Sequence, residues 1–125
     1  NIGCPKKYSP NKNILNLARK ERVKLTITSK PLEAAIGADC VMTDKWISMN
    51  DKVNKASKKK ILKPYQVNKK LMSKANSDAI FMHCLPVGRG EEVTNEVIDG
   101  KQSVVWRQAL NRVHAQKSII KWCLD

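Results

Sequence analysis

The chain has 125 residues, 42% of them apolar, and a formal net charge of +13 at pH 7. This length suits one domain with a hydrophobic core, and it excludes a two-domain enzyme with a cleft between its domains. Nowhere does the sequence approach the roughly 18 consecutive apolar residues of a membrane-spanning helix, so we expect no membrane partner.

The excess of basic residues, 24 against 11 acidic ones, is carried mainly by lysine. Aromatic residues make up 5% of the chain and are not interleaved with the basic clusters, so no platform for stacking bases is indicated. We therefore expect a lysine-rich solvated surface that attracts small anions, with no specific nucleic-acid partner. A lysine-rich nucleic-acid-binding module is the alternative from another functional class.

The four cysteines are Cys4, Cys40, Cys84 and Cys123, and they are widely scattered. Because they form no CxxC pair and have no histidine at ligand spacing, we predict neither a metal site nor a disulfide framework. The first ten residues do not resemble a signal peptide. Reduced cysteines and the missing signal predict a cytoplasmic protein.

The first third of the chain predicts a helix, a strand and a second helix. Ser9 is a suitable N-cap for a helix that ends near Glu21. Residues 23–28 alternate apolar and polar side chains, which predicts a strand. Residues 31–38 then form a short predicted helix that closes at Gly37. The first residues look like the continuation of a strand, which suggests that the chain is a piece of a larger protein.

The middle third predicts two strands separated by lysine-rich helices. Residues 39–43 form a short buried strand, and Asp44 follows at its carboxyl end. A lysine-rich helix ends near Leu62, and a second helix covers residues 68–75. Residues 79–82 are an apolar run that predicts a buried strand.

The last third predicts a helix over 91–98, a strand over 103–106 and a helix from 108 to the end with a broad apolar face. Strands that alternate with helices are typical of an α/β fold with a parallel sheet and helices on both faces.

The most informative motif comprises His83, Cys84, Leu85 and Pro86, directly after the apolar run 79–82. Open α/β sheets bind ligands at the carboxyl ends of their strands, so chemistry is expected here. Cys84 offers a thiol, His83 a titratable donor, and a cis bond before Pro86 would turn the Leu85 carbonyl toward a ligand. A buried cysteine beside a satisfied core histidine is the plainer interpretation, and it stays open.

Three separated segments together resemble the carboxyl-terminal part of the ornithine carbamoyltransferase family: TDKWISMN (43–50), FMHCLPVGRGEEVTNEVIDG (81–100) and QALNRVHAQKSIIKWCL (108–124). The resemblance implies transfer of the carbamoyl group of carbamoyl phosphate to the δ-amine of L-ornithine, giving L-citrulline and phosphate. It implies neither cofactor nor metal. A carbamoyltransferase for another amine, such as putrescine, remains an alternative.

The same resemblance implies a Rossmann-like fold that is an incomplete second domain of a carbamoyltransferase. Residues 1–125 then form a partial ornithine-binding domain, and the helix over about 108–125 packs on an amino-terminal carbamoyl-phosphate domain that the chain lacks. The implied assembly is a homotrimer. The isolated chain is therefore expected to be inactive.

Site residues carry over position by position. Asp44 matches the carboxylate that holds the α-ammonium of ornithine, and Ser48 and Met49 match the loop that closes on the amino acid. In this loop the family usually has Gly where the chain has Asn50, a residue that also tolerates a positive φ.

The reacting groups match Cys84 and the Leu85 carbonyl, which contact the carbamoyl group and the δ-amine. Arg112 matches the arginine that reaches the carbamoyl oxygen or phosphate, where an oxyanion develops. His83 and Pro86 support the motif, and Asp44, Cys84 and Arg112 are predicted to converge on one cleft. Departures from the family pattern include Arg107 and Leu110, which stand where relatives commonly carry acids.

Overall fold

The strands pair only in parallel within residues 1–47 and 54–125, which the computed structural model describes. Strand β1 (Ile2–Gly3) pairs with β2 (Ile27–Thr28), and β3 (Cys40–Thr43) pairs with β4 (Ile80–His83). The predicted α/β class with parallel pairing is confirmed. The described strands form two separate two-stranded sheets, whereas the sequence predicted one sheet.

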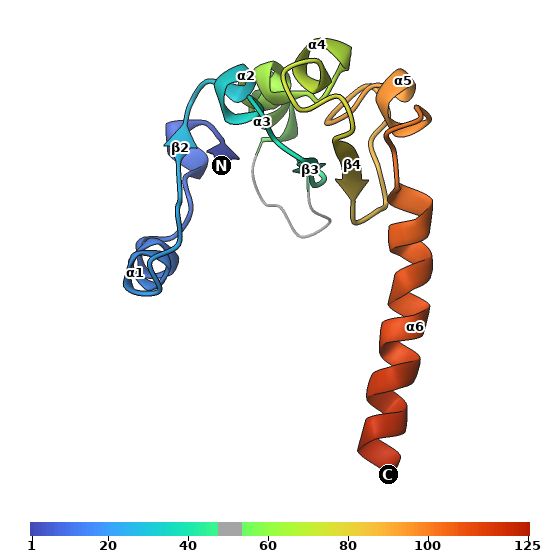
Figure 1. The fold of residues 1–125 in the computed structure, drawn as a ribbon. Helices are drawn as coiled ribbons and strands as arrows, with labels where there is room; N and C mark the ends of the chain where they lie inside the picture. Colours follow the sequence, from blue (N-terminus) through green and yellow to red (C-terminus); the bar gives the residue numbers. More distant parts are fainter. Residues whose placement is uncertain (48–53) are drawn as a thin grey trace.

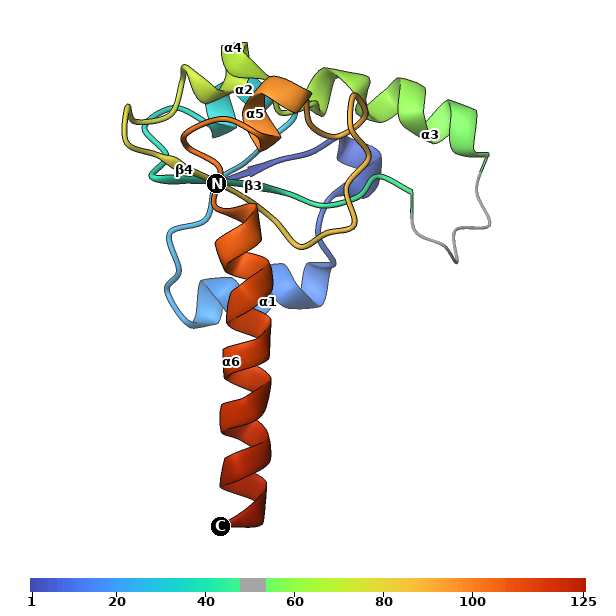
Figure 2. The same cartoon turned by 90° about the vertical axis from the view of Figure 1, so that its right-hand side faces the viewer.

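Helices lie on both sides of the strands, as predicted. Helices α2 to α5 lie on one side, and α1 and α6 extend on the other (Figures 1 and 2). The α-helices are α1 (Lys12–Lys20), α2 (Pro31–Ala34), α3 (Lys55–Leu62), α4 (Lys69–Met72), α5 (Asn95–Ile98) and α6 (Val105–Leu124), and Lys6–Tyr8 and Lys63–Tyr65 form short 3-10 helices. This arrangement is a Rossmann-like α/β fold.

Asparagine side chains begin three of these helices. Asn11 accepts a hydrogen bond from the backbone N–H of Asn13 at 2.8 Å, and Asn54 and Asn68 cap α3 and α4 in the same way. Each cap satisfies a backbone donor that the first helical turn leaves unpaired. The prediction that Ser9 caps α1 is wrong, because Asn11 lies closer to the helix and makes the bond.

The core lies around β4, whose Phe81 is completely buried. Both edges of β4 are occupied near this residue: β3 pairs on one side, and Phe81 exchanges backbone hydrogen bonds with Gln102 and Val104 on the other. The other buried apolar side chains of the core cluster are Ala35, Val41, Val67, Leu71, Met72, Val93, Val97, Ile98 and Val105. Strand β4 therefore lies in the centre of the core cluster, with backbone hydrogen bonds on both sides of Phe81.

The predicted strand over 103–106 is wrong. Only Ser103 forms a bridge, to Phe81, and α6 begins at Val105, three residues before the predicted start at 108. Two adjacent valines favour a strand locally, but the Val105 side chain is fully buried in the core, and this packing outweighs its local preference.

Other predicted elements are shorter than expected. Only Ile27–Thr28 of the predicted strand 23–28 pairs with a neighbour, since Val23 is exposed and has no facing strand. Helix α5 begins at Asn95 and not at 91, because Glu91 and Glu92 form a turn before the helix. The helices predicted over 31–38 and 68–75 also end early, at Ala34 and Met72.

Helix α6 is 20 residues long, and Val105 is its one buried residue. Large apolar side chains are exposed along it, among them Leu110 at 57% and Trp122 at 80%. Figure 2 shows the helix extending far from the strands. No helix in the described part of the chain is long and apolar enough to cross a membrane.

Candidate functional site

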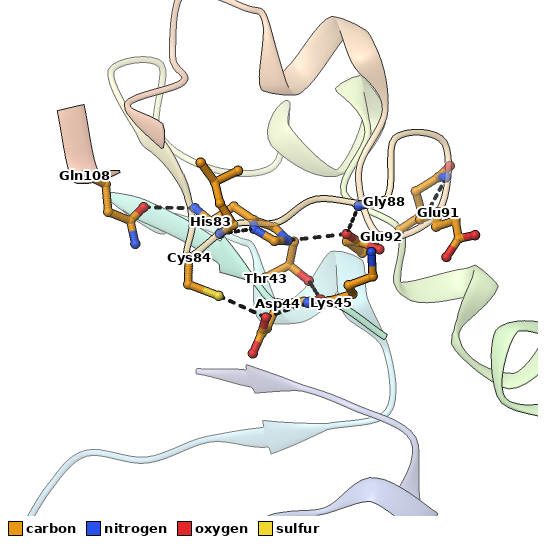
Figure 3. A network of polar contacts seen from close by, with 11 residues as sticks. Thr43, Asp44, Lys45, His83, Cys84, Gly88, Glu91, Glu92 and Gln108 are labelled. Carbon is orange, nitrogen blue, oxygen red and sulfur yellow. Dashed lines mark hydrogen bonds and ion pairs between the residues drawn. The ribbon is translucent and has the colours of Figure 1, made fainter. Parts of the chain in front are cut away.

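The carboxyl ends of β3 and β4 bring two predicted site residues together. The parallel register places Thr43 beside His83, so Asp44 and Cys84 leave the sheet at the same edge. Cys84 Sγ lies 3.0 Å from Asp44 Oδ1 and donates a hydrogen bond to it (Figure 3). The predicted convergence of these two residues is confirmed.

The hydrogen bond sets the charge state of this pair. The Asp44 carboxylate raises the pKa of the Cys84 thiol, and partial burial raises it further. In turn, the hydrogen bond from Cys84 lowers the pKa of Asp44, with a smaller contribution from the backbone N–H of Lys45. At neutral pH the pair is therefore a thiol and a carboxylate. Cys84 acts as a hydrogen-bond donor and not as a thiolate nucleophile.

Asp44 keeps one oxygen for a ligand. The hydrogen bonds from Cys84 and from the backbone N–H of Lys45, 2.6 Å long, both use Oδ1. Among the described residues Oδ2 takes no hydrogen bond, and the Asp44 side chain is exposed. A carboxylate in this position can bind an ammonium group by a charge-assisted hydrogen bond.

Arg112 faces the same strand end from α6. Cys84, Leu85, Pro86 and Arg112 line an open cavity of about 620 Å³, together with Trp106, Ala109, Val113 and Gln116. The positive charge of Arg112 acts to lower the pKa of Cys84, although less strongly than Asp44 raises it. Of the three residues predicted to converge on one cleft, Cys84 and Arg112 line this cavity, whereas Asp44 contacts Cys84 but is not among the lining residues.

The backbone at Leu85 has an unusual geometry, of which the cis bond was predicted and the positive φ was not. The bond from Leu85 to Pro86 is cis, and Leu85 has a φ of 54°. A positive φ is uncommon for a residue with a branched side chain, so neighbouring contacts must hold the conformation. The contacts include a 2.9 Å hydrogen bond from the Leu85 N–H to His83 Nδ1.

His83 is buried behind the cavity, where it makes two further contacts. Its backbone N–H donates to Gln108 Oε1 at 3.0 Å, which ties the first turn of α6 to the end of β4. Its Nε2 lies 3.4 Å from Oε1 of the buried Glu92 (Figure 3). Neither Gln108 nor Glu92 was predicted from the sequence as a residue of the site. Glutamate is rarely buried, and the partner that would reveal Glu92 is distant in sequence.

Three predicted or noted positions, Ser48, Met49 and Asn50, lie outside the described residues. The departures Arg107 and Leu110 are both exposed on α6. Among the described residues no cluster of three or more His, Cys, Asp or Glu side chains could hold a metal ion.

A second cavity, of about 250 Å³, lies between β1 and β3 and includes Gly3, Val41 and Trp46 in its lining. It contains neither Cys84 nor Arg112, so the hydrogen-bonding and charged groups favour the cavity at the end of β4 as the site.

The chain is similar over nearly its whole length to known proteins. The sequence profile for the "Aspartate/ornithine carbamoyltransferase, Asp/Orn binding domain" family matches residues 1–123. An ornithine carbamoyltransferase of Rhodopseudomonas palustris is 56% identical over 124 residues, 99% of this chain and 40% of that protein. One from Brucella abortus is 51% identical over 125 residues, 100% of this chain and 40% of that protein.

Solved structures agree with these relatives. The ornithine carbamoyltransferase from Pyrococcus furiosus superposes with a TM-score of 0.84 at 41% identity, over 94% of this chain and 39% of that one. The anabolic enzyme from Campylobacter jejuni gives a TM-score of 0.88 at 34% identity, over 97% and 41%. The chain thus spans about 40% of the length of the curated relatives it matches.

Proposed function

The chain belongs to the aspartate/ornithine carbamoyltransferase family, and from this membership we propose that it is the ornithine-binding part of an ornithine carbamoyltransferase. The complete enzyme transfers the carbamoyl group of carbamoyl phosphate to the δ-amine of L-ornithine and releases L-citrulline and phosphate. The observation that carries the proposal is the Asp44–Cys84 hydrogen bond at the edge of the cavity that Arg112 lines.

Asp44 binds the α-ammonium group of ornithine. Its exposed Oδ2 is the acceptor, while Oδ1 stays occupied by Cys84 and by the backbone of Lys45. Ser48 and Met49 match the positions that the family uses for the same end of the amino acid. An α-ammonium in this position favours an amino-acid substrate over putrescine.

The δ-amine then reacts beside Cys84 and Leu85. Ornithine's δ-ammonium resembles that of lysine, with a free pKa of about 10.4, so it must lose a proton before it can attack. The Leu85 carbonyl accepts a hydrogen bond from the amine and orients it toward the carbamoyl carbon. The neutral amine forms a C–N bond to the carbamoyl carbon and gives a tetrahedral intermediate. The C–O bond to phosphate then breaks, and the departing phosphate carries away the electron pair and accepts the proton that the attacking nitrogen releases.

Arg112 and the Cys84 thiol stabilise the charge that develops during this attack. The carbamoyl oxygen becomes an oxyanion in the tetrahedral intermediate, and donors fixed in advance lower its energy. The positive charge of Arg112 suits this oxygen or the departing phosphate. No metal or organic cofactor takes part.

The rest of the active enzyme supplies what residues 1–125 do not. A carbamoyl-phosphate-binding domain packs against the exposed apolar face of α6 and closes the open side of the cavity. The enzyme works in the cytoplasm as a homotrimer. The matched relatives, which are longer than this chain, support this division of labour.

The proposal is tested by a chimera, in which residues 1–125 replace the part of the Rhodopseudomonas palustris enzyme that they match. We expect the chimera to form citrulline from carbamoyl phosphate and ornithine, and to use putrescine far less well. A folded, trimeric chimera that forms no citrulline would refute the proposal. If the chimera used putrescine better than ornithine, the proposed substrate would be putrescine and not ornithine.

A further inference from the structure

A buried pair of side chains lies directly beneath the Leu85 turn. His83 is 1% exposed and Glu92 is 0% exposed. Burying a carboxylate costs free energy unless hydrogen bonds or charges compensate for it. Glu92 Oε1 accepts a short hydrogen bond from the Gly88 N–H and lies 3.4 Å from His83 Nε2, whereas Oε2 has no partner in the described structure. These contacts compensate only part of the free-energy cost of burying the Glu92 carboxylate, so its presence in the core requires an explanation.

The contacts of His83 specify where its proton lies. Nδ1 accepts a hydrogen bond from the Leu85 N–H, so it carries no proton. In a neutral imidazole the proton is then on Nε2, the atom that faces Glu92 Oε1. The 3.4 Å contact is not aligned for a full hydrogen bond, so its attraction is mainly electrostatic. Glu92 thus favours the tautomer in which Nδ1 can accept.

Two backbone N–H groups of the loop 85–88 donate hydrogen bonds to the His83–Glu92 pair. Leu85 donates to His83 Nδ1, and Gly88 donates to Glu92 Oε1 (Figure 3). Gly88 also allows the close approach, since a Cβ at this position would lie 2.7 Å from Glu92 Oε2. The same loop contributes Leu85 and Pro86 to the cavity that Arg112 lines. Movement of the pair would therefore move the loop.

We propose that Glu92 is a positioning residue for carbamoyl transfer, which acts through the His83 tautomer to hold the Leu85 carbonyl in place. The inference rests on the proposed function. Glu92 touches no substrate and moves no proton during the reaction. Its role is to keep His83 Nδ1 available as an acceptor, so that the backbone at Leu85 keeps its left-handed conformation.

The chimera described above tests this role by comparing Glu92→Ala with Glu92→Gln. Glu92→Ala removes both contacts, and we expect kcat to fall on the order of 100-fold, the cost typical of a small misplacement of a reacting group. KM for ornithine should change little, because Asp44 is untouched. Glu92→Gln keeps an oxygen that can accept from the Gly88 N–H and face His83 Nε2 with a partial negative charge, and it should restore kcat to within about 10-fold of the parent.

A second pair of variants tests the link through His83. Asparagine places an oxygen near the position of Nδ1, whereas glutamine reaches the position of Nε2. We expect His83→Asn to retain at least about 10-fold more activity than His83→Gln, because only asparagine can accept from the Leu85 N–H. Melting temperatures of the two variants should be similar. This comparison stands even if Glu92→Ala does not fold.

Matched controls are Glu91→Ala and His114→Asn. Glu91 is the adjacent acid and pairs at the surface with Lys59, and His114 is the other histidine, exposed on α6. Both control variants should keep kcat within about twofold of the parent. A readout independent of activity is nitrogen-15 NMR of His83 in the chimera, which should show a protonated Nε2 and an unprotonated Nδ1.

Three results would overturn the inference while leaving the proposed function standing: parental kcat in Glu92→Ala, equal losses in folded Glu92→Ala and Glu92→Gln, or a proton on His83 Nδ1. If Glu92→Gln lowered kcat as much as Glu92→Ala does, the negative charge of the carboxylate would itself take part in the chemistry. An unsubstituted chimera that forms no citrulline would instead refute the proposed function.

Discussion

The end of β4 and helix α6 line the same cavity but are held in opposite ways. At the end of β4, Phe81 and His83 are buried, and contacts within the chain hold the loop that follows. Along α6, every residue after Val105 is exposed or only partly buried, and Arg112 is on this exposed part. One half of the site is therefore held by contacts within the described residues, whereas Arg112 lies on a part of α6 that no described residue buries.

The largest effect expected from this difference is loss of activity in the isolated chain. Residues 1–125 alone should form no detectable citrulline, because neither the phosphate-binding part nor the closing wall of the cleft is present. A coupled citrulline assay on the isolated chain and on the chimera, at equal concentration, measures this. Citrulline formation by the isolated chain would show that the site is wrongly assigned.

Within the chimera, the two halves of the site should be equally necessary. Cys84→Ala and Arg112→Ala should each lower the rate on the order of 100-fold or more, as for loss of a donor to a developing oxyanion. Lys117→Ala removes an exposed charge from the same helix and serves as the control. Full activity in both site variants would reject the roles of Cys84 and Arg112.

Substitutions in the two regions should change stability unequally, although both regions are needed for activity. Phe81→Ala should destabilise the isolated chain by about 3–5 kcal/mol, because it leaves a cavity in the core. Leu110→Ala removes an exposed side chain and should change the free energy of unfolding by less than about 0.5 kcal/mol. Denaturant titrations of both variants measure these values. Similar losses would mean that α6 is already packed in the isolated chain.

The smallest expected effect concerns the reactivity of Cys84. Asp44 raises the pKa of the thiol, so little thiolate is present at pH 8. Asp44→Asn removes the charge and should lower that pKa, which should speed alkylation of Cys84 by about fivefold at pH 8. Alkylation of the exposed Cys40, followed by mass spectrometry in the same sample, is the internal reference. An unchanged Cys84 rate would contradict the charge assignment of the pair.

The sequence predicted the parts of the site that depend on local pattern. The apolar run before His83 and the short strand before Asp44 located two strand ends, and parallel pairing then placed Asp44 beside Cys84. The cis bond before Pro86 and the convergence of Arg112 were also predicted. The ligand edge of an α/β sheet was sufficient to place Asp44 and Cys84, whereas Arg112 was identified only through the resemblance to the carbamoyltransferase family.

The parts that the sequence did not predict depend on contacts between distant residues. Val104 and Val105 favour a strand locally, yet burial of Val105 begins a helix there. Glu92 was predicted to be part of a helix over 91–98, whereas it lies in the turn before α5 and is buried against His83. Both errors arise because tertiary packing, which no local pattern encodes, determines whether these side chains are buried.

Amide hydrogen exchange, measured on the isolated chain at a dilution where it is monomeric and on the chimera, tests the contrast between the end of β4 and α6 most directly. We predict that the amides of Leu85 and Gly88 are protected in both proteins, whereas amides in the part of α6 from Gln108 onward gain strong protection only in the chimera. Equal protection of α6 in both proteins, or free exchange of the Leu85 and Gly88 amides in both, would contradict this account.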